Sequence, residues 1–257
     1  MKPLAGKHVL ITRGRSQARV LSRIIEREGG VAVETPLLSF QLNDTDENQE
    51  ILGRLHEYQW VFITSSNGVK FFFELVQQYN SDLSENTRFA IIGSKTNRML
   101  KSYGYEADFI PSVYNAEVMI EEFFEKERNV GKILYVRGNR SRDLLPEAFR
   151  ERGVFFQSIT VYDTLLMKDA NKKINRSLTK GSLDALTFTS PSAIQAYMAI
   201  VKGMENRGLS VPCFCIGPTT ARKAEEAGFE HVHIPEQYTI ENMVEQMRQY
   251  FTEEGER

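Results

Sequence analysis

The stretch Pro212-Cys-Phe-Cys-Ile-Gly-Pro-Thr-Thr-Ala-Arg222 places a glycine turn between a short apolar run and a helical pattern. The apolar run from Cys213 to Ile216 is typical of a buried strand, and it stops at Gly217. The residues after the turn repeat with helical spacing, so the turn is followed by a helix N-terminus. Because the first turn of a helix leaves backbone N–H groups unpaired, this turn can hold a carboxylate or a phosphate. The simpler interpretation is that the glycine only allows tight packing of the strand on the helix.

The same pattern occurs earlier in the chain, in Ala90-Ile-Ile-Gly-Ser-Lys-Thr-Asn-Arg98, at an offset of 124 residues (217 − 93 = 124). The pairs that coincide at this offset are Gly93 and Gly217, Thr96 and Thr220, Arg98 and Arg222, Gly104 and Gly228, and Pro111 and Pro235. Further pairs are Arg13-Gly14 with Arg137-Gly138 at 124 and Thr64-Ser65 with Thr189-Ser190 at 125. A period this long indicates an internal duplication into two domains of similar build, because solenoid repeats are several-fold shorter.

Composition agrees with two ordinary globular domains. The 257 residues are 41% apolar and 26% charged, which is enough for two hydrophobic cores. The formal net charge of −2 provides no basic field, so we expect neither nucleic acid nor an acidic membrane surface as a partner. The N-terminus lacks the apolar segment of a secretion signal, and no apolar run is long enough for a membrane span, so we expect a cytoplasmic protein. Cys213 and Cys215 alternate on one strand and are interpreted as core residues.

Predicted strands alternate with predicted helices throughout the chain. This pattern favours an α/β fold with two similar domains, each a parallel β-sheet flanked by helices, with the ligand face at the carboxyl ends of the strands. Residues 35–41 and 159–165 occupy equivalent positions in the two copies and both look extended. The main buried strands are expected at His8–Thr12, Trp60–Thr64, Lys132–Val136, Ala185–Thr189 and Cys213–Ile216.

The loops after these strands are rich in hydrogen-bond donors and poor in catalytic groups. For each serine or threonine the alternative is an ordinary helix N-cap, and for each arginine it is a solvated surface residue. The four histidines lack the neighbours of a metal site, and neither G-x-G-x-x-G nor a P-loop occurs, so we expect no metal and no nucleotide cofactor. The candidate substrate-binding residues are Thr12, Arg13, Thr64, Ser65, Ser66, Asn67, Ser94, Thr96, Arg137, Gly138, Ser190, Ser192, Gly217, Thr219 and Thr220.

Five short motifs, in this order and spacing, resemble the uroporphyrinogen-III synthase family over nearly the whole chain. They are Ile-Thr-Arg13, Phe-Ile-Thr-Ser-Ser-Asn-Gly-Val69, Val-Tyr-Asp-Thr164, Phe-Thr-Ser-Pro-Ser-Ala193 and Ile-Gly-Pro-Thr-Thr-Ala-Arg222. The resemblance implies a cofactor-free lyase of tetrapyrrole (heme) biosynthesis. Its reaction would close the linear tetrapyrrole hydroxymethylbilane into uroporphyrinogen III, with loss of water and inversion of ring D. Many family members have a proline after Thr-Ser, and the second copy has one at Pro191. Ser66 stands at that position in the first copy and departs from this pattern.

The resemblance also implies a discontinuous domain organisation. Residues 1–36 plus 165–257 would form the first α/β domain and residues 41–160 the second, joined by a two-stranded linker at 37–40 and 161–164. The expected protein is a monomer that acts on a linear tetrapyrrole, with hydroxymethylbilane synthase as the donor of that substrate.

Tyr162 is the candidate catalytic residue. Its duplicate partner is Leu38 (162 − 124 = 38), so the hydroxyl is present in only one copy. A tyrosine hydroxyl can donate at neutral pH, and the family's Val-Tyr motif supports a role in donating a hydrogen bond or a proton to the leaving hydroxyl. The alternative is a linker tyrosine whose ring only packs. A function from another class also stays open, namely a two-lobed binding or sensing module for an anionic metabolite, without turnover.

Overall fold

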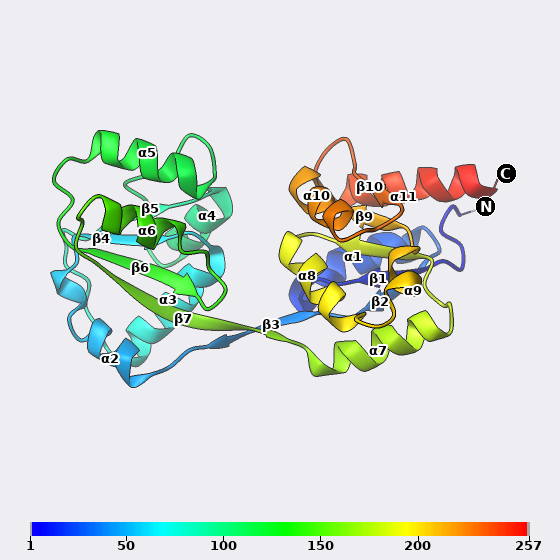
Figure 1. Ribbon diagram of the computed structural model, residues 1–257, viewed down its shortest axis with the longest axis horizontal. Helices are drawn as coiled ribbons and strands as arrows, with labels where there is room; N and C mark the ends of the chain where they lie inside the picture. The colour runs from blue at the N-terminus through cyan, green and yellow to red at the C-terminus, as the bar shows by residue number, and fades with distance from the viewer. Residues whose placement is uncertain (1, 256–257) are drawn as a thin grey trace. The chain divides into compact units, whose positions relative to one another are not determined.

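The computed structural model describes residues 2–255, and the chain divides into two compact units (Figure 1). Unit 1 comprises Met1–Ser39 and Leu165–Arg257, and unit 2 comprises Phe40–Thr164. The chain therefore begins in unit 1, passes into unit 2 and returns. Each unit contains one five-stranded sheet with helices on both faces. None of the helices within residues 2–255 combines the length and the apolar character that crossing a bilayer requires.

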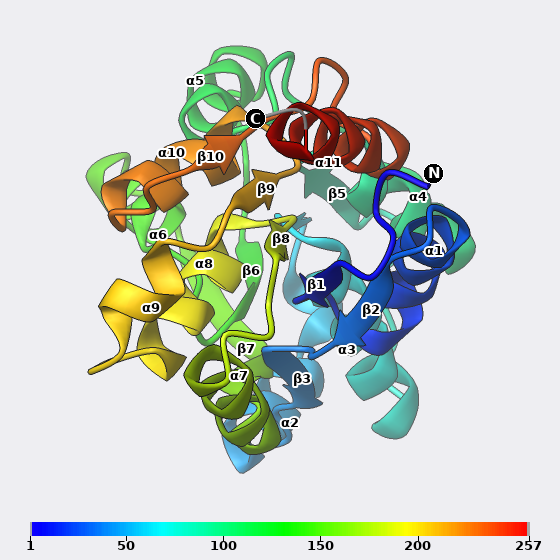
Figure 2. The same ribbon diagram turned by 90° about the vertical axis from the view of Figure 1, so that its right-hand side faces the viewer.

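Unit 1 is built on a sheet with the strand order β10-β9-β8-β1-β2 (Figure 2). All four neighbouring pairs in this sheet are parallel, as the alternation of strands and helices predicted. Its strands are β1 (His8–Ile11), β2 (Val31–Glu34), β8 (Ala185–Phe188), β9 (Cys213–Cys215) and β10 (Val232–His233). Its helices are α1 (Arg15–Arg27), α7 (Lys168–Thr179), α8 (Pro191–Ile200), α9 (Glu205–Leu209), α10 (Pro218–Glu226) and α11 (Ile240–Gly255).

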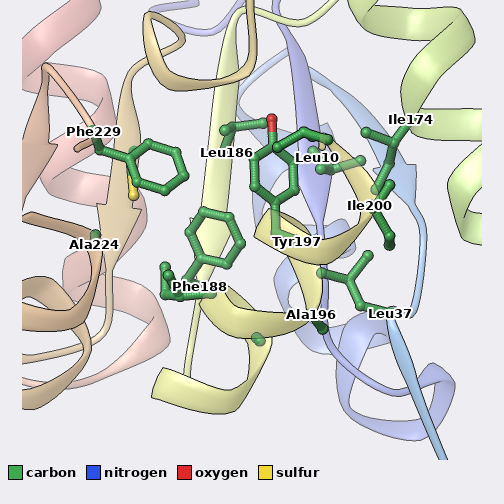
Figure 3. Close-up of a cluster of buried hydrophobic side chains, with 14 of the residues drawn as sticks. Leu10, Leu37, Ile174, Leu186, Phe188, Ala196, Tyr197, Ile200, Ala224 and Phe229 are labelled. Carbon is green, nitrogen blue, oxygen red and sulfur yellow. The ribbon is translucent and has the colours of Figure 1, made fainter. Parts of the chain in front are cut away.

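Both faces of this sheet are covered, and the strands β1, β8 and β9 are almost entirely buried. Helices α1 and α11 pack on one face against side chains such as Val9 and Phe214. The other face carries α7, α8 and α10, and Figure 3 shows its central aromatic group, where the ring of Phe188 lies 5.3 Å from Tyr197 and 5.7 Å from Phe229. Cys213 and Cys215 are both fully buried, which confirms that they are core residues.

Unit 2 repeats this arrangement with the strand order β3-β7-β6-β4-β5. Helices α5 and α6 cover one face, around Trp60, Phe62 and Phe123, and helices α2, α3 and α4 cover the other. Its strands are β3 (Leu38–Leu42), β4 (Trp60–Ile63), β5 (Arg88–Ile91), β6 (Ile133–Gly138) and β7 (Phe156–Leu166), of which β3 begins and β7 ends in residues of unit 1. Its helices are α2 (Asp46–Leu52), the 3-10 turn η1 (Leu55–Glu57), α3 (Ser66–Gln78), α4 (Ser94–Ser102), α5 (Ala116–Lys126) and α6 (Leu144–Glu151).

The edge strand β3 makes the sheet of unit 2 mixed rather than parallel. The N–H of Met167 donates to the carbonyl of Leu37 at 2.9 Å, and the N–H of Asn43 donates to the carbonyl of Val161 at 3.0 Å. The two residue numbers give the same sum in both bonds (37 + 167 = 43 + 161), which is the register of an antiparallel pair. The other pairs in this sheet are parallel. The expectation of two parallel sheets therefore needs this one correction.

Candidate active site

The candidate residues lie at the carboxyl ends of parallel strands in both units. Thr64 directly follows β4, Arg137 and Gly138 end β6, and Tyr162 lies in β7, which neighbours β6. In unit 1, Thr12 follows β1, and Ser190 and Gly217 stand shortly after β8 and β9. Because all carboxyl ends of a parallel sheet meet at one edge, the order of the strands gathers these residues at that edge of each unit.

Tyr162 is held by aromatic neighbours within unit 2. Its ring stacks on Phe71 at 5.4 Å between centroids and meets the edge of Phe40 at 5.8 Å. Its side chain is only 9% exposed, and its hydroxyl lies 3.4 Å from the Oγ of Ser65. The structure therefore fixes the orientation of this ring and brings two predicted site residues, one from β7 and one from the loop after β4, into contact.

Gly138 makes room for the ring of Tyr162. A Cβ at Gly138 would lie 2.6 Å from the Cε2 and 2.8 Å from the hydroxyl of Tyr162, which is closer than side-chain atoms can approach. The pairing of β6 with β7 shifts register between Arg137 and Gly138, and this irregularity sets Gly138 opposite Tyr162. Gly138, a candidate substrate-binding residue in the sequence, is thus also a steric requirement of the candidate catalytic residue.

The guanidinium of Arg137 has its hydrogen-bond partners within the segment that directly follows β6. Its Nη1 donates to Asp143 Oδ1 at 2.7 Å, and its Nη2 donates to the carbonyl of Ser141. The loop is closed further because the N–H of Ser141 donates to the carbonyl of Gly138 at 3.0 Å, and the N–H of Gly138 donates to Ser141 Oγ at 3.1 Å. The guanidinium therefore shapes the turn after β6, in addition to any contact it makes with a ligand.

A pocket of about 330 Å³ opens at the same edge of unit 2. Its polar wall combines Thr64 from the loop after β4 with Tyr135 from β6 and the two exposed arginines of the β6–α6 loop, Arg140 and Arg142. The N-terminus of α5 contributes Tyr114 and Asn115. Two cations, hydroxyls and an aromatic ring in one pocket suit a ligand that is both anionic and aromatic.

Tyr135 is the buried polar group of this pocket. Burial raises the pKa of its hydroxyl above the ordinary tyrosine value, while hydrogen bonding with Thr64 and the charge of Arg137 act in the opposite direction. Its side chain is 3% exposed. The hydroxyl is therefore a neutral hydrogen-bond donor and acceptor over the physiological pH range.

Ser65 and Ser190 are helix N-caps at equivalent positions. Ser65 Oγ accepts from the N–H of Gly68 at 3.0 Å, and Ser190 Oγ accepts from the N–H of Ala193 at 3.2 Å. The expected helix starts after both strands are thereby confirmed. Ser190 Oγ also lies 3.0 Å from the exposed Ser192 Oγ, while Ser66 and Asn67 are half-buried in the first turn of α3.

Each of the two glycine turns is followed by one exposed hydroxyl and one buried hydroxyl. Gly93 and Gly217 are themselves the N-caps of α4 and α10. In the following turn Ser94 and Thr219 are exposed, whereas Thr96 and Thr220 are only 4% and 3% exposed. Thr220 is thus neither the cap of α10 nor an open surface donor, because Gly217 occupies the cap position and Pro218 begins the helix.

Thr12 and Arg13 follow β1 in unit 1. Thr12 is buried, and its Oγ1 donates to the carbonyl of Thr187 at 2.7 Å, which ties the end of β1 to β8. Arg13 is half-buried, and burial lowers the pKa of its guanidinium. Within residues 2–255, no group of three or more histidine, cysteine, aspartate or glutamate side chains is arranged to hold a metal ion.

Sequence reasoning missed Tyr114, Tyr135, Arg140 and Arg142, all of which line the pocket. Tyr135 belongs to an apolar strand, so its pattern is that of a core residue. The arginines stand in the polar run Asn139-Arg-Ser-Arg142, where only the fold distinguishes a pocket wall from a solvated loop. Tyr114 could have been found from the sequence, because the offset of 124 residues between the two copies pairs it with Tyr238.

Comparison with known proteins adds three findings. Residues 19–245 match the model of the family described as HEM4, uroporphyrinogen-III synthase HemD. The chain is 26% identical over 96% of its length to the porphyrin biosynthesis protein HemD of Ruminiclostridium josui, of whose length it spans 49%. It is 29% identical to uroporphyrinogen-III synthase of Chlorobaculum parvum, with 90% of this chain and 94% of that protein covered.

The fold is also that of solved structures. A mutant uroporphyrinogen III synthase from the extremely thermophilic bacterium Thermus thermophilus superimposes with a TM-score of 0.75 over 96% of this chain and 100% of the other, at 17% identity. At that identity the likeness concerns the fold alone.

Proposed function

Because the chain belongs to the uroporphyrinogen-III synthase family, we propose that it closes hydroxymethylbilane into uroporphyrinogen III, with loss of water and inversion of ring D. The single observation that carries the proposal is the family match over residues 19–245, which includes all the strand ends of unit 2 and those of unit 1 except the end of β1. The reaction is that of a lyase that needs no cofactor. The bilane carries acetate and propionate groups on every ring, and the donor-rich strand ends are suited to these carboxylates.

Tyr162 is the proposed proton donor to the departing hydroxyl. The C–O bond of the hydroxymethyl group breaks, the hydroxyl leaves as water with the donated proton, and the electron-rich pyrrole system stabilises the cation that remains. The fixed ring of Tyr162 and the contact of its hydroxyl with Ser65 support this role, because a proton donor must be held in one orientation. Little else in the way of strong acids or bases is needed, since the main task is to orient the rings.

The other candidate residues are proposed either to bind the periphery of the substrate or to hold the loops that do so. Exposed or half-buried donors suit direct contact, namely Thr64, Ser66, Asn67, Ser94, Ser192 and Thr219. Arg137, Thr12 and Thr220 have structural partners or buried positions, so their contribution is to hold the loops that carry those donors. A cytoplasmic monomer that receives its substrate from hydroxymethylbilane synthase remains the prediction for the cell.

The test is to incubate the protein with freshly generated hydroxymethylbilane, oxidise the products and separate the porphyrin isomers. We expect isomer III, because the uncatalysed reaction closes the ring without inversion and yields isomer I. The protein is first dialysed against EDTA, and the activity is expected to survive. Isomer I alone would support a binding module without turnover, and activity that returns only with an added metal would contradict the cofactor-free reaction.

A further inference from the structure

Two exposed tyrosines, Tyr114 in unit 2 and Tyr238 in unit 1, occupy equivalent positions in the two copies (238 − 114 = 124). Their side chains are 60% and 63% exposed. Four residues earlier in each loop stands an isoleucine, Ile110 or Ile234, which is 37% or 38% exposed. A single exposed aromatic residue needs no explanation, but the same exposed pair in both halves of a duplicated chain does.

Both tyrosines sit at the centre of the same tight turn. The N–H of Asn115 donates to the carbonyl of Val113 at 2.8 Å, and the N–H of Thr239 donates to the carbonyl of Gln237 at 2.7 Å. A hydrogen bond from residue i+2 to residue i defines a three-residue turn, in which the central side chain points away from the closed backbone. The backbone therefore presents both tyrosines in the same way.

The residue after each tyrosine is a helix N-cap. Asn115 Oδ1 accepts from the N–H of Val118 at 2.7 Å at the start of α5, and Thr239 Oγ1 accepts from the N–H of Asn242 at 3.2 Å at the start of α11. A capped helix fixes where its first residue stands. Each tyrosine is thus anchored on one side by the turn and on the other by the helix.

Each ring lies beside the glycine turn of its own unit. A Cβ at Gly93 would lie 3.9 Å from Tyr114 Cδ2, and a Cβ at Gly217 would lie 3.3 Å from Tyr238 Cγ. The φ of Gly217 is −178°, an extended conformation that any residue adopts, so the nearby ring rather than the backbone is what limits that position. The rings therefore stand at the strand ends where the donors gather.

We propose that Tyr114 presents its ring as a stacking surface for a pyrrole ring of a linear tetrapyrrole, and that Tyr238 is the equivalent stacking surface of unit 1. The inference rests on the proposed function and names two residues that contact its substrate. Tyr114 lines the 330 Å³ pocket together with Thr64, Arg140 and Arg142, so a pyrrole on its face would have its carboxylates beside two guanidinium groups. An aromatic ring offers a planar contact that does not depend on which carboxylate lies where, and this suits a substrate of four similar rings.

The alternative is that each ring only shields its glycine turn. To separate the two, the KM and kcat for hydroxymethylbilane are measured for Tyr114→Ala and Tyr238→Ala, with the spontaneous reaction subtracted. Loss of a stacking contact is expected to raise KM about threefold to tenfold in each single variant, with kcat within about twofold of the parent. Tyr→Phe at either position keeps the ring and should leave KM within about twofold.

Phe155→Ala is the matched control. Phe155 is 66% exposed and stands just before β7, at the amino end of the strands, so its loss should leave KM unchanged. Thermal unfolding is recorded for every variant, and Tyr→Leu replaces Tyr→Ala if the alanine variant does not fold, because leucine keeps an apolar cover without an aromatic face. A parental KM in the Ala or Leu variants would overturn the inference, whether or not stability falls. A parent that makes no isomer III would reject the proposed function itself.

Discussion

At the scale of single residues, the packing around Tyr162 fixes the orientation of its ring. Its ring is clamped by Phe71 and Phe40 and is given space by Gly138, so removing the hydroxyl should not move the ring. Tyr162→Phe is expected to lower kcat on the order of 10²-fold with little change in KM, because a proton donated to the leaving hydroxyl acts mainly in the transition state. The measurement is steady-state formation of isomer III.

Tyr103→Phe provides the control for this prediction. It removes the same atom from a tyrosine of the same unit whose ring is stacked on Phe73 at 4.5 Å, and it should leave kcat unchanged. Turnover of Tyr162→Phe within about twofold of the parent would reduce Tyr162 to a packing residue. In that case the buried hydroxyl of Tyr135 is the next donor of unit 2 to test.

At the scale of helices, the duplicated caps allow the same substitution to be made twice. Ser65→Ala and Ser190→Ala each remove one side-chain acceptor from the first turn of an equivalent helix, α3 or α8. Each is expected to cost about 1 kcal/mol of unfolding free energy, and Ser→Thr at either position should restore most of it. Urea denaturation followed by circular dichroism measures both. Unchanged stability in the alanine variants would mean that water replaces the caps at no cost.

Most helices and strands could be predicted from the sequence because several strands are followed by a glycine turn or by a serine that caps the next helix. Gly217 and Gly93 mark helix starts, Ser65 and Ser190 mark caps, and the structure confirms these helix boundaries. The antiparallel β3 was not predictable from periodicity, because alternation along a strand carries no information on the direction of its neighbour.

The site was less predictable than the fold, for a related reason. Donors at strand ends follow from the pattern of α/β units, but whether a donor is open or occupied depends on tertiary contacts. Thr96 and Thr220 are buried, and Arg137 is engaged by Asp143. The steric requirement at Gly138 depends on a register shift between β6 and β7, which no local pattern encodes.

At the scale of the whole molecule, the return of the chain into unit 1 raises the question of where unit 2 ends. Domain bounds of 41–160 leave Val161 and Tyr162 in a linker, yet both belong to the buried cluster of unit 2, and Val161 is fully buried. The carbonyl of Val161 also accepts from the N–H of Asn43 at 3.0 Å. These residues are therefore part of the core that unit 2 needs in order to fold.

Two fragments of the chain test this argument. Residues 40–164 are expected to unfold cooperatively in urea, whereas residues 41–160 should be less stable by at least about 3 kcal/mol, since burying a valine and a tyrosine ring is worth about 1.5–3 kcal/mol each. Extending the longer fragment to 38–166 is the control. It adds Leu38, which packs in the core of unit 1, and the exposed Leu165 and Leu166, so we expect a gain of no more than about 0.5 kcal/mol. Equal urea midpoints for 41–160 and 40–164 would contradict this assignment, and Tyr162 would then have to be held in place by contacts outside the core of unit 2.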